Sequence, residues 1–275
     1  MNKCEEIEKI EIELLLEAVY RQYGYDFRNY AYSSLKRRIH YYTQRLNIEN
    51  ISELQGKILY DPKLMEGLSN VLSITVTEMF RDPSFFGAFR SSVIPYLKDV
   101  GHIRIWHAGC ASGEEVYSMA ILLHEAGLYE KSIIYATDIN EQILEKAKEG
   151  KFPLKKMQQY TKNYLASGGT KEFSKYYSCD EKFATIHSFL KENIVFAHHN
   201  LATDHSFNEF HIIICRNVII YFNKQLKERV FQLFYESLTE GGYLGLGSKE
   251  SLIGSSYSDK ILEVDANNKL LKKGH

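Results

Sequence analysis

Two adjacent carboxylates, Glu114 and Glu115, follow a loop of small residues, G-C-A-S-G, which itself follows the apolar run IRIWHA. A loop of this kind before a helix points free backbone N–H groups at a ligand, and the helix dipole favours anions there. Two negative charges at this place instead repel phosphate and attract a cation. Acids in a first helical turn also stabilise the helix by about 0.3–1 kcal/mol, so the pair alone leaves both interpretations open.

A third acid, Asp138, ends the apolar run IIYATD. In open α/β sheets, a carboxylate at the carboxyl end of the neighbouring strand can accept hydrogen bonds from ribose hydroxyls. Combined with Glu115, it favours a ligand that contains a nucleoside and a positive charge but no phosphate. S-adenosylmethionine, with its ribose, sulfonium and α-ammonium, is such a ligand. The loop also lacks the G-x-G-x-x-G pattern of dinucleotide folds and the Lys-Ser/Thr of a P-loop.

Three further segments carry polar or aromatic residues where such a ligand would need them. The candidate residues are Asn200 and Leu201 in FAHHNLATD, Arg216, Asn217 and Tyr221 in IIICRNVIIYF, and Thr77 and Arg81 in VTEMFRDP. Each has a purely structural interpretation as well. Asn200 could cap a turn, Tyr221 could belong to the core, and Arg81 could pair with Asp82 or another acid.

Apolar runs after residue 102 are typical of strands buried on both faces, which favours a mainly parallel sheet covered by helices. The predicted strands are IRIWHA, IIYATDI, IVFAHHN, FHIIICRN and YLGLGS. KILEVDANNKLLKK predicts a hairpin at the sheet edge, turning at Asn267 and Asn268. Residues 151–193 predict a short helix and a small antiparallel insertion.

The first 90 residues have few strand signals and predict helices. One helix should stop at Gly24, a plausible C-cap. A second should bury Leu35, Ile39, Tyr42 and Leu46, with Ser33 or Ser34 as its N-cap. A third should carry Pro62 in its first turn.

Composition excludes several classes of protein. The net charge of −1 gives no footprint for nucleic acid, and four scattered cysteines without a CxxC pair argue against zinc or a disulfide framework. The acidic start does not suit a signal peptide, and no apolar run approaches a membrane span. We expect a cytoplasmic protein, monomeric, without metal and without direct membrane insertion.

The five ordered motifs ITVTEMFRDP, WHAGCASGEEVYS, YATDIN, HNL and CRNVIIYF strongly resemble the chemotaxis receptor methyltransferases of the CheR type, over about residues 1–272. The resemblance implies transfer of a methyl group from S-adenosylmethionine to receptor glutamates, giving methyl esters and S-adenosylhomocysteine. Three departures are mild: Thr75 stands where many members have Asn, Met79 and Phe80 stand where they have two Phe, and Gly-Cys stands where others have Ala-Ala.

The resemblance also implies site residues and domains. Arg81 and Tyr221 match the reaction centre, and the cofactor contacts carried over are Thr75, Thr77, Arg81, Gly109, Glu115, Asp138, Asn200, Leu201, Arg216 and Asn217. We expect a Rossmann-like methyltransferase domain over 86–275, with a small β-subdomain at about 151–193. A helical domain over 1–85 should precede it and dock the receptor's helical bundle.

The basic segment 27–48, which contains no Asp or Glu, is the predicted docking surface. Arg37, Arg38 and Arg45 are its candidate substrate-binding residues, although charged helix faces are usually just solvated.

Three alternatives to catalysis on receptor glutamates were weighed. A non-catalytic binding module of the same fold would lack methyl transfer. A nucleic-acid methyltransferase would need an N/D-P-P-Y/F-type motif, and an NAD-dependent oxidoreductase would need the missing third glycine.

Overall fold

The computed structural model describes residues 3–73 and 77–274, which form two compact units. The helical unit comprises residues 3–73 with 200–204 and 221–230. The sheet unit comprises 77–199, 205–220 and 231–274.

The helical unit contains four helices packed around one apolar core: α1 (Lys3–Tyr23), α2 (Tyr32–Arg45), α3 (Ile51–Tyr60) and α4 (Pro62–Leu72). The predicted end of α1 is confirmed, since Gly24 has a φ of 78°. Pro62 opens α4 as predicted, and Leu35, Ile39 and Tyr42 are buried. Leu46 lies just past the end of α2 and is only partly buried.

Two details of the helical unit differ from the sequence prediction. Neither Ser33 nor Ser34 caps α2: the helix begins one residue before Ser33, and the flanking Ala31 makes no side-chain cap. Helix α3 was not predicted. Its N-cap is Asn50, whose side chain accepts a hydrogen bond from the Glu53 N–H.

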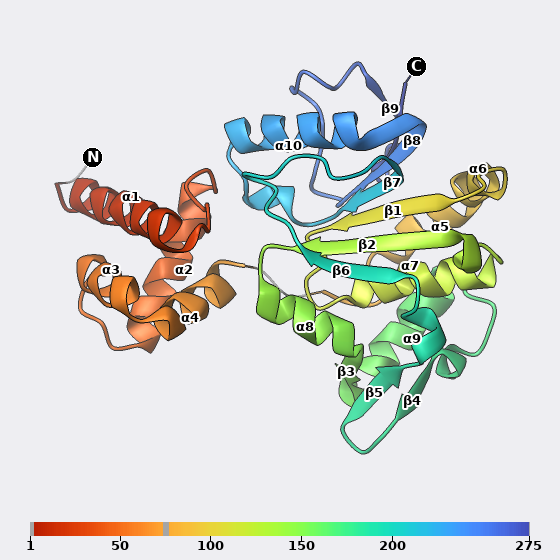
Figure 1. Ribbon diagram of the computed structural model, residues 1–275, viewed down its shortest axis with the longest axis horizontal. Coiled ribbons are helices and arrows are strands. Elements are labelled where there is room, and N and C mark those ends of the chain that lie inside the picture. Colours follow the sequence, from red (N-terminus) through yellow and green to blue (C-terminus); the bar gives the residue numbers. More distant parts are fainter. Residues whose placement is uncertain (1–2, 74–76, 275) are drawn as a thin grey trace. The chain divides into compact units, whose positions relative to one another are not determined.

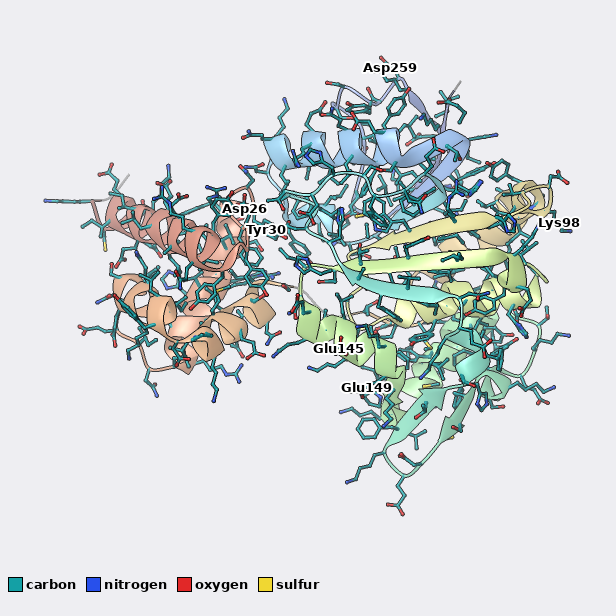
Figure 2. All side chains as sticks on the ribbon, in the orientation of Figure 1. Asp26, Tyr30, Lys98, Glu145, Glu149 and Asp259 are labelled. Atoms are coloured by element: carbon teal, nitrogen blue, oxygen red, sulfur yellow. The ribbon has the colours of Figure 1, made fainter. Side chains whose placement is uncertain are left out.

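The segment after α1 joins the later part of this unit. Ala31 donates its N–H to the Tyr221 carbonyl at 2.7 Å, and the Tyr30 ring packs against Phe222. Figure 2 places Asp26 and Tyr30 close together on this segment. Residues Tyr221 to Phe222 are therefore held by the chain that leads into α2.

The sheet unit is built on a seven-stranded sheet of order β6-β2-β1-β7-β8-β10-β9. Its strands are β1 (Ile103–Ala108), β2 (Ser132–Asp138), β6 (Ile194–His198), β7 (Phe210–Cys215), β8 (Leu238–Leu246), β9 (Ile261–Asp265) and β10 (Leu270–Lys273). The first five strands of that order pair in parallel. Strand β10 pairs antiparallel with β8, and β9 pairs antiparallel with β10. The predicted parallel sheet and edge hairpin are confirmed.

Burial of β6 corrects one part of the prediction. Strand β6 lies at the edge of the sheet, and Val195 is 45% exposed. An apolar run of this length therefore does not by itself indicate a strand buried on both faces.

Helices and a small second sheet complete this unit. The helices are α5 (Pro83–Ser92), α6 (Ile94–Lys98), α7 (Glu114–Glu125), α8 (Glu141–Glu149), α9 (Met157–Ala166) and α10 (Lys224–Ser237), the last of which begins in the helical unit. Helices α7 and α8 cover the same side of the sheet (Figure 1). The predicted insertion is present as α9 and a three-stranded antiparallel sheet of β3 (Lys151–Pro153), β5 (Phe183–Ile186) and β4 (Tyr177–Cys179).

Candidate cofactor and methyl-transfer site

The loop between β1 and α7 is fastened to the carboxyl end of β2. The N–H groups of Gly109 and Cys110 both donate to the Thr137 carbonyl, at 2.8 and 2.9 Å, and the Ala111 N–H donates to the Asp138 carboxylate at 2.9 Å. Gly109 has a φ of 77°, and a Cβ there would lie 2.5 Å from the Val218 side chain. Only glycine lets the loop pass this close to the chain after β7.

Asp138 is a partly exposed carboxylate at the end of β2, as the sequence predicted. Its Oδ2 accepts the Ala111 N–H and its Oδ1 accepts the Asn140 N–H at 3.0 Å. Burial raises the pKa of Asp138, and hydrogen bonds from the Asn140, Ala111 and Ile139 backbone oppose that rise. A carboxylate has about four acceptor positions, so Asp138 retains capacity for a ligand hydroxyl.

The two acids after the loop have different environments. Glu114 is buried and accepts hydrogen bonds from Ser112 and from the Tyr160 hydroxyl of α9, and burial raises the pKa of its carboxyl. Glu115 instead forms an ion pair with Arg216, with 2.7 Å between Oε2 and Nη1. The Glu114 carboxylate therefore contacts the insertion, and of the two acids only Glu115 belongs to the candidate site.

Burial raises the pKa of Glu115, but the charges of Arg216 and His107 outweigh burial, so that the net pKa is lowered. Its other oxygen lies 3.4 Å from the buried His107 Nδ1. Glu115 is therefore ionised at neutral pH and already has a cationic partner, which the sequence did not reveal.

Arg216 holds the turn that carries Arg81. Its side chain is 1% exposed, with Nη1 donating to the Arg81 carbonyl at 3.2 Å and Nη2 donating to Asp82 at 2.7 Å. The guanidinium also lies 4.2 Å from the centre of the Phe85 ring. Arg216 is buried between acids and aromatic rings, in the arrangement expected of a residue that fixes its neighbours.

The backbone of this turn is strained. Phe80 and Asp82 both have positive φ, 51° and 53°, which non-glycine residues rarely adopt. The Phe80 N–H donates to the Ser118 hydroxyl at 2.8 Å, and its ring is fully buried. Arg81 is partly exposed between these two anchored residues. Strain held by surrounding contacts is common at functional sites.

Two of the predicted cofactor residues, Thr75 and Thr77, precede this turn in the sequence. Thr75 lies outside the described residues. Thr77 is described and partly buried, just ahead of the strained turn.

Asn200, Leu201 and Tyr221 belong to the helical unit. The Asn200 side chain accepts the Ala202 N–H at 2.9 Å, which makes it a turn cap, and Leu201 is buried. The Tyr221 ring is partly exposed and lies 5.0 Å from the Arg38 guanidinium.

The basic residues of α2 do not share one environment. Arg37 and Arg45 are exposed, whereas Arg38 is partly buried and donates to the Leu72 carbonyl at 2.6 Å. Burial lowers the pKa of Arg38, and Tyr221 opposes the change. The predicted basic strip is thus divided between Arg38, bonded to the end of α4, and the two solvent-facing arginines.

Glu250, Asp82 and His107 are the residues of this region that the sequence analysis missed. Glu250 follows β8, is 3% exposed and accepts hydrogen bonds from the chain after β7. Asp82 was considered as a partner of Arg81 but pairs with Arg216. For His107, the signal was a histidine inside an apolar strand, two residues before a site loop.

Within residues 3–73 and 77–274, no group of three or more His, Cys, Asp or Glu side chains is arranged to hold a metal ion. Over the same residues, no helix has the length and apolar character needed to cross a membrane.

A mainly parallel sheet with a carboxylate at the end of β2 and a glycine loop after β1 is the arrangement seen in nucleoside-binding α/β domains. Residues 75–267 match the family model described as CheR methyltransferase, SAM binding domain, and residues 10–73 match CheR methyltransferase, all-alpha domain. The chain belongs to the CheR family of S-adenosylmethionine-dependent methyltransferases.

Curated relatives match along most of their length. A Pseudomonas putida protein named "Putative methyltransferase Cher3" is 49% identical over 252 residues, which cover 92% of each chain. A chemotaxis protein methyltransferase of Listeria monocytogenes is 29% identical, covering 86% of this chain and 87% of that protein. One from Borreliella burgdorferi is 28% identical and covers 93% of both.

The geometry of the sheet unit fits S-adenosylmethionine. Asp138 has acceptor capacity and exposure for a ribose hydroxyl, and Gly109 leaves the loop without a side chain where another would collide with Val218. The Asp138 carboxylate also brings an acidic group to this end of the sheet, whereas the charge of Glu115 is already paired with Arg216.

Proposed function

We propose that this protein transfers the methyl group of S-adenosylmethionine to glutamate side chains of chemotaxis receptors, forming glutamyl methyl esters for sensory adaptation. The names of the relatives from Listeria and Borreliella support a role in chemotaxis. The observation that carries the proposal is the anchored turn around Arg81, which the buried Arg216 connects to Glu115. It places a cationic side chain on a rigid support in a family of methyltransferases.

The proposed reaction requires few catalytic groups from the protein. A glutamate with a pKa near 4.3 is ionised at neutral pH, so no general base is needed. S-adenosylmethionine supplies an electrophilic methyl, whose bond to sulfur breaks as a carboxylate oxygen of the substrate attacks in line. The protein's tasks are to orient that carboxylate and to exclude water.

Arg81 is the proposed orienting residue. Its guanidinium can hold an incoming carboxylate through charge-assisted hydrogen bonds. The strain at Phe80 and Asp82 suits this role, because a fixed turn loses little entropy when the substrate binds. A catalytic role for Tyr221, whose ring Arg38 contacts within the helical unit, stays a proposal from the family resemblance.

The proposed cofactor contacts are those of the sequence analysis, with the structure giving them unequal roles. Asp138 is the proposed ribose acceptor, and Arg216 is proposed to position Glu115 and the Arg81 turn rather than to bind the ligand by a free guanidinium. Gly109 and Asn217 lie in the loops after β1 and β7, and Thr75, Thr77, Asn200 and Leu201 stay proposals from the family resemblance.

The proposed partner is the cytoplasmic helical bundle of a receptor. Arg37 and Arg45 are exposed on α2 and are the proposed contacts for its acidic surface. We propose that Arg38 instead supports the Tyr221 ring. The protein would act as a monomer in the cytoplasm.

Transfer of labelled methyl groups tests the proposal. The purified protein, labelled S-adenosylmethionine and receptor cytoplasmic fragments should give label on the receptor that mild base releases, as expected of an ester. Arg81→Ala should abolish most of this label while the protein stays folded. Label that resists base, or no label with any receptor fragment, would reject methyl-ester formation.

A further inference from the structure

Glu250 is a buried carboxylate that accepts four backbone hydrogen bonds. Its Oε2 accepts the N–H groups of Asn217 at 3.0 Å and Gly247 at 2.6 Å. Its Oε1 accepts the N–H groups of Val218 at 2.9 Å and Ile220 at 3.2 Å. Three of these donors come from the loop that follows β7.

The loop needs such an acceptor because its backbone departs from regular structure. Asn217 has a φ of 63°, in the left-handed region. Buried N–H groups without partners cost free energy comparable to a lost hydrogen bond. A single carboxylate that accepts three of them stabilises a conformation that the loop would not adopt by itself.

The turn after β8 is shaped to bring Glu250 this close. A Cβ on Gly247 would lie 2.8 Å from both the Glu250 Oε2 and the Asn217 nitrogen. Any residue larger than glycine would therefore separate the carboxylate from the loop. This close approach is a second sign, independent of the hydrogen bonds, that the contact is built into the fold.

Backbone donors, rather than a cation, hold the carboxylate in place. Among residues 3–73 and 77–274, no ion pair joins Glu250 to a Lys, Arg or His. Burial raises the pKa of Glu250, and the hydrogen bonds from Gly247, Asn217, Ile220 and Val218 oppose that rise. All four acceptor positions of the carboxylate are used within the protein.

We propose that Glu250 is a positioning residue that fixes the loop after β7 and thereby sets the affinity of the site for S-adenosylmethionine. The link to the cofactor rests on the proposed function, which includes Asn217, at the start of that loop, among the proposed cofactor contacts. Glu250 itself does not touch the cofactor, because its oxygens have no acceptor capacity left.

Glu250→Gln is the sharpest variant. It keeps the size of the side chain but replaces one oxygen with an NH₂ group, which faces N–H donors and repels them. Glu250→Asp keeps the charge but shortens the reach, and should give an intermediate effect. Glu125→Gln is the matched control, since Glu125 is also a buried carboxylate of the sheet unit but binds Arg90, Tyr164 and Tyr176 instead.

Two readouts on the apo full-length chain test the inference. Amide hydrogen exchange at Asn217, Val218 and Ile220 should accelerate about tenfold or more in Glu250→Gln, and calorimetry should show S-adenosylhomocysteine binding about tenfold or more weaker. Glu125→Gln should change neither quantity, even if it lowers the unfolding temperature as much.

Wild-type exchange rates in Glu250→Gln, or equal effects of Glu125→Gln, would overturn the positioning role. Faster loop exchange with unchanged S-adenosylhomocysteine affinity would overturn the link to the cofactor. A wild-type chain that does not bind S-adenosylhomocysteine would reject the proposed function instead, and faster loop exchange in the variant would still support Glu250 as the residue that fixes the loop.

Discussion

In the sheet unit, one carboxylate lies at the end of strand β2 and another follows strand β8, but the two differ in how many acceptor positions the protein itself uses. Glu250 accepts two backbone hydrogen bonds at each oxygen and is 3% exposed. Asp138 accepts the Ala111 and Asn140 amides, one at each oxygen, and is partly exposed. A carboxylate saturated by its own protein fixes structure, whereas one with spare acceptor capacity can bind a ligand.

The ion pair of Glu115 with Arg216 gives the largest expected effect on stability. Glu115→Gln leaves a guanidinium that is 1% exposed with the more exposed Asp82 as its remaining charged partner. Breaking a buried pair costs about 3–5 kcal/mol, and because Asp82 remains we expect a loss at the lower end, about 3 kcal/mol. Thermal or urea unfolding of the apo protein measures this loss. A Glu114→Gln control should cost less, because burial raises the pKa of Glu114 and its one cationic neighbour in the described residues, Lys156, is partly exposed and 3.6 Å away. A neutral result for Glu115→Gln would place Glu115 with the ligand rather than with the fold.

The same pair predicts a pH dependence. The folded-state pKa of Glu115 is lowered below its ordinary value, so its contribution to stability is present above that value and is lost as pH falls through the lowered pKa. Wild-type stability should therefore fall more steeply in acid than that of Glu115→Gln. Parallel acid-unfolding curves for the two proteins would contradict the ion pair.

Asp138→Asn should weaken S-adenosylhomocysteine binding by about 1.5–3 kcal/mol, since a hydrogen bond to a charged acceptor contributes about that much. It should lower the unfolding temperature of the apo protein less than Glu250→Gln does, because Asp138 accepts one backbone N–H at each oxygen and Glu250 accepts two. Calorimetry and thermal unfolding of the same samples separate the two quantities. A variant that loses stability but keeps affinity would make Asp138 resemble Glu250.

The raised pKa of Asp138 also predicts how cofactor affinity depends on pH. Its carboxyl takes up a proton at a higher pH than an ordinary Asp, so cofactor affinity should begin to fall at a higher pH than an ordinary Asp would cause. In Asp138→Asn this acid-side decline should be absent. An identical pH profile in the variant would exclude Asp138 as the group that titrates.

The smallest expected effects come from the arginines of α2. They show the same contrast, because Arg38 is bonded within the protein whereas Arg37 faces solvent. Arg38→Gln removes hydrogen bonds to the end of α4 and the contact with Tyr221, and should cost about 0.5–1.5 kcal/mol of stability. Arg37→Gln should leave stability unchanged and raise the KM for receptor, with an effect that salt screens. A KM for receptor that rises in Arg38→Gln but not in Arg37→Gln would reverse these assignments.

Sequence reasoning predicted those parts of the site that depend on local pattern. Asp138 and the glycine loop follow apolar runs that end at one edge of a parallel sheet, so their proximity follows from topology. The hairpin and the insertion were also predicted from turns and alternation. These features are encoded within about ten residues of chain.

The parts that sequence reasoning missed depend on contacts between distant residues. Arg216 pairs with Glu115 and Asp82 over more than 100 residues, and no local pattern indicates such a partner. Glu250 stands in a Ser- and Lys-containing turn that is typical of exposed loops. Arg38 differs from Arg37 only by its position around one helical turn, and the end of α4 decides which is buried.

Mass spectrometry of the receptor after reaction tests the central claim most directly. Incubation of the purified protein with S-adenosylmethionine and a receptor cytoplasmic fragment should give peptides in which a glutamate side chain has gained one methyl group. The same peptides should be unmodified with Arg81→Ala. Methyl groups found only on other residue types, or on glutamates to the same extent with Arg81→Ala, would contradict the account.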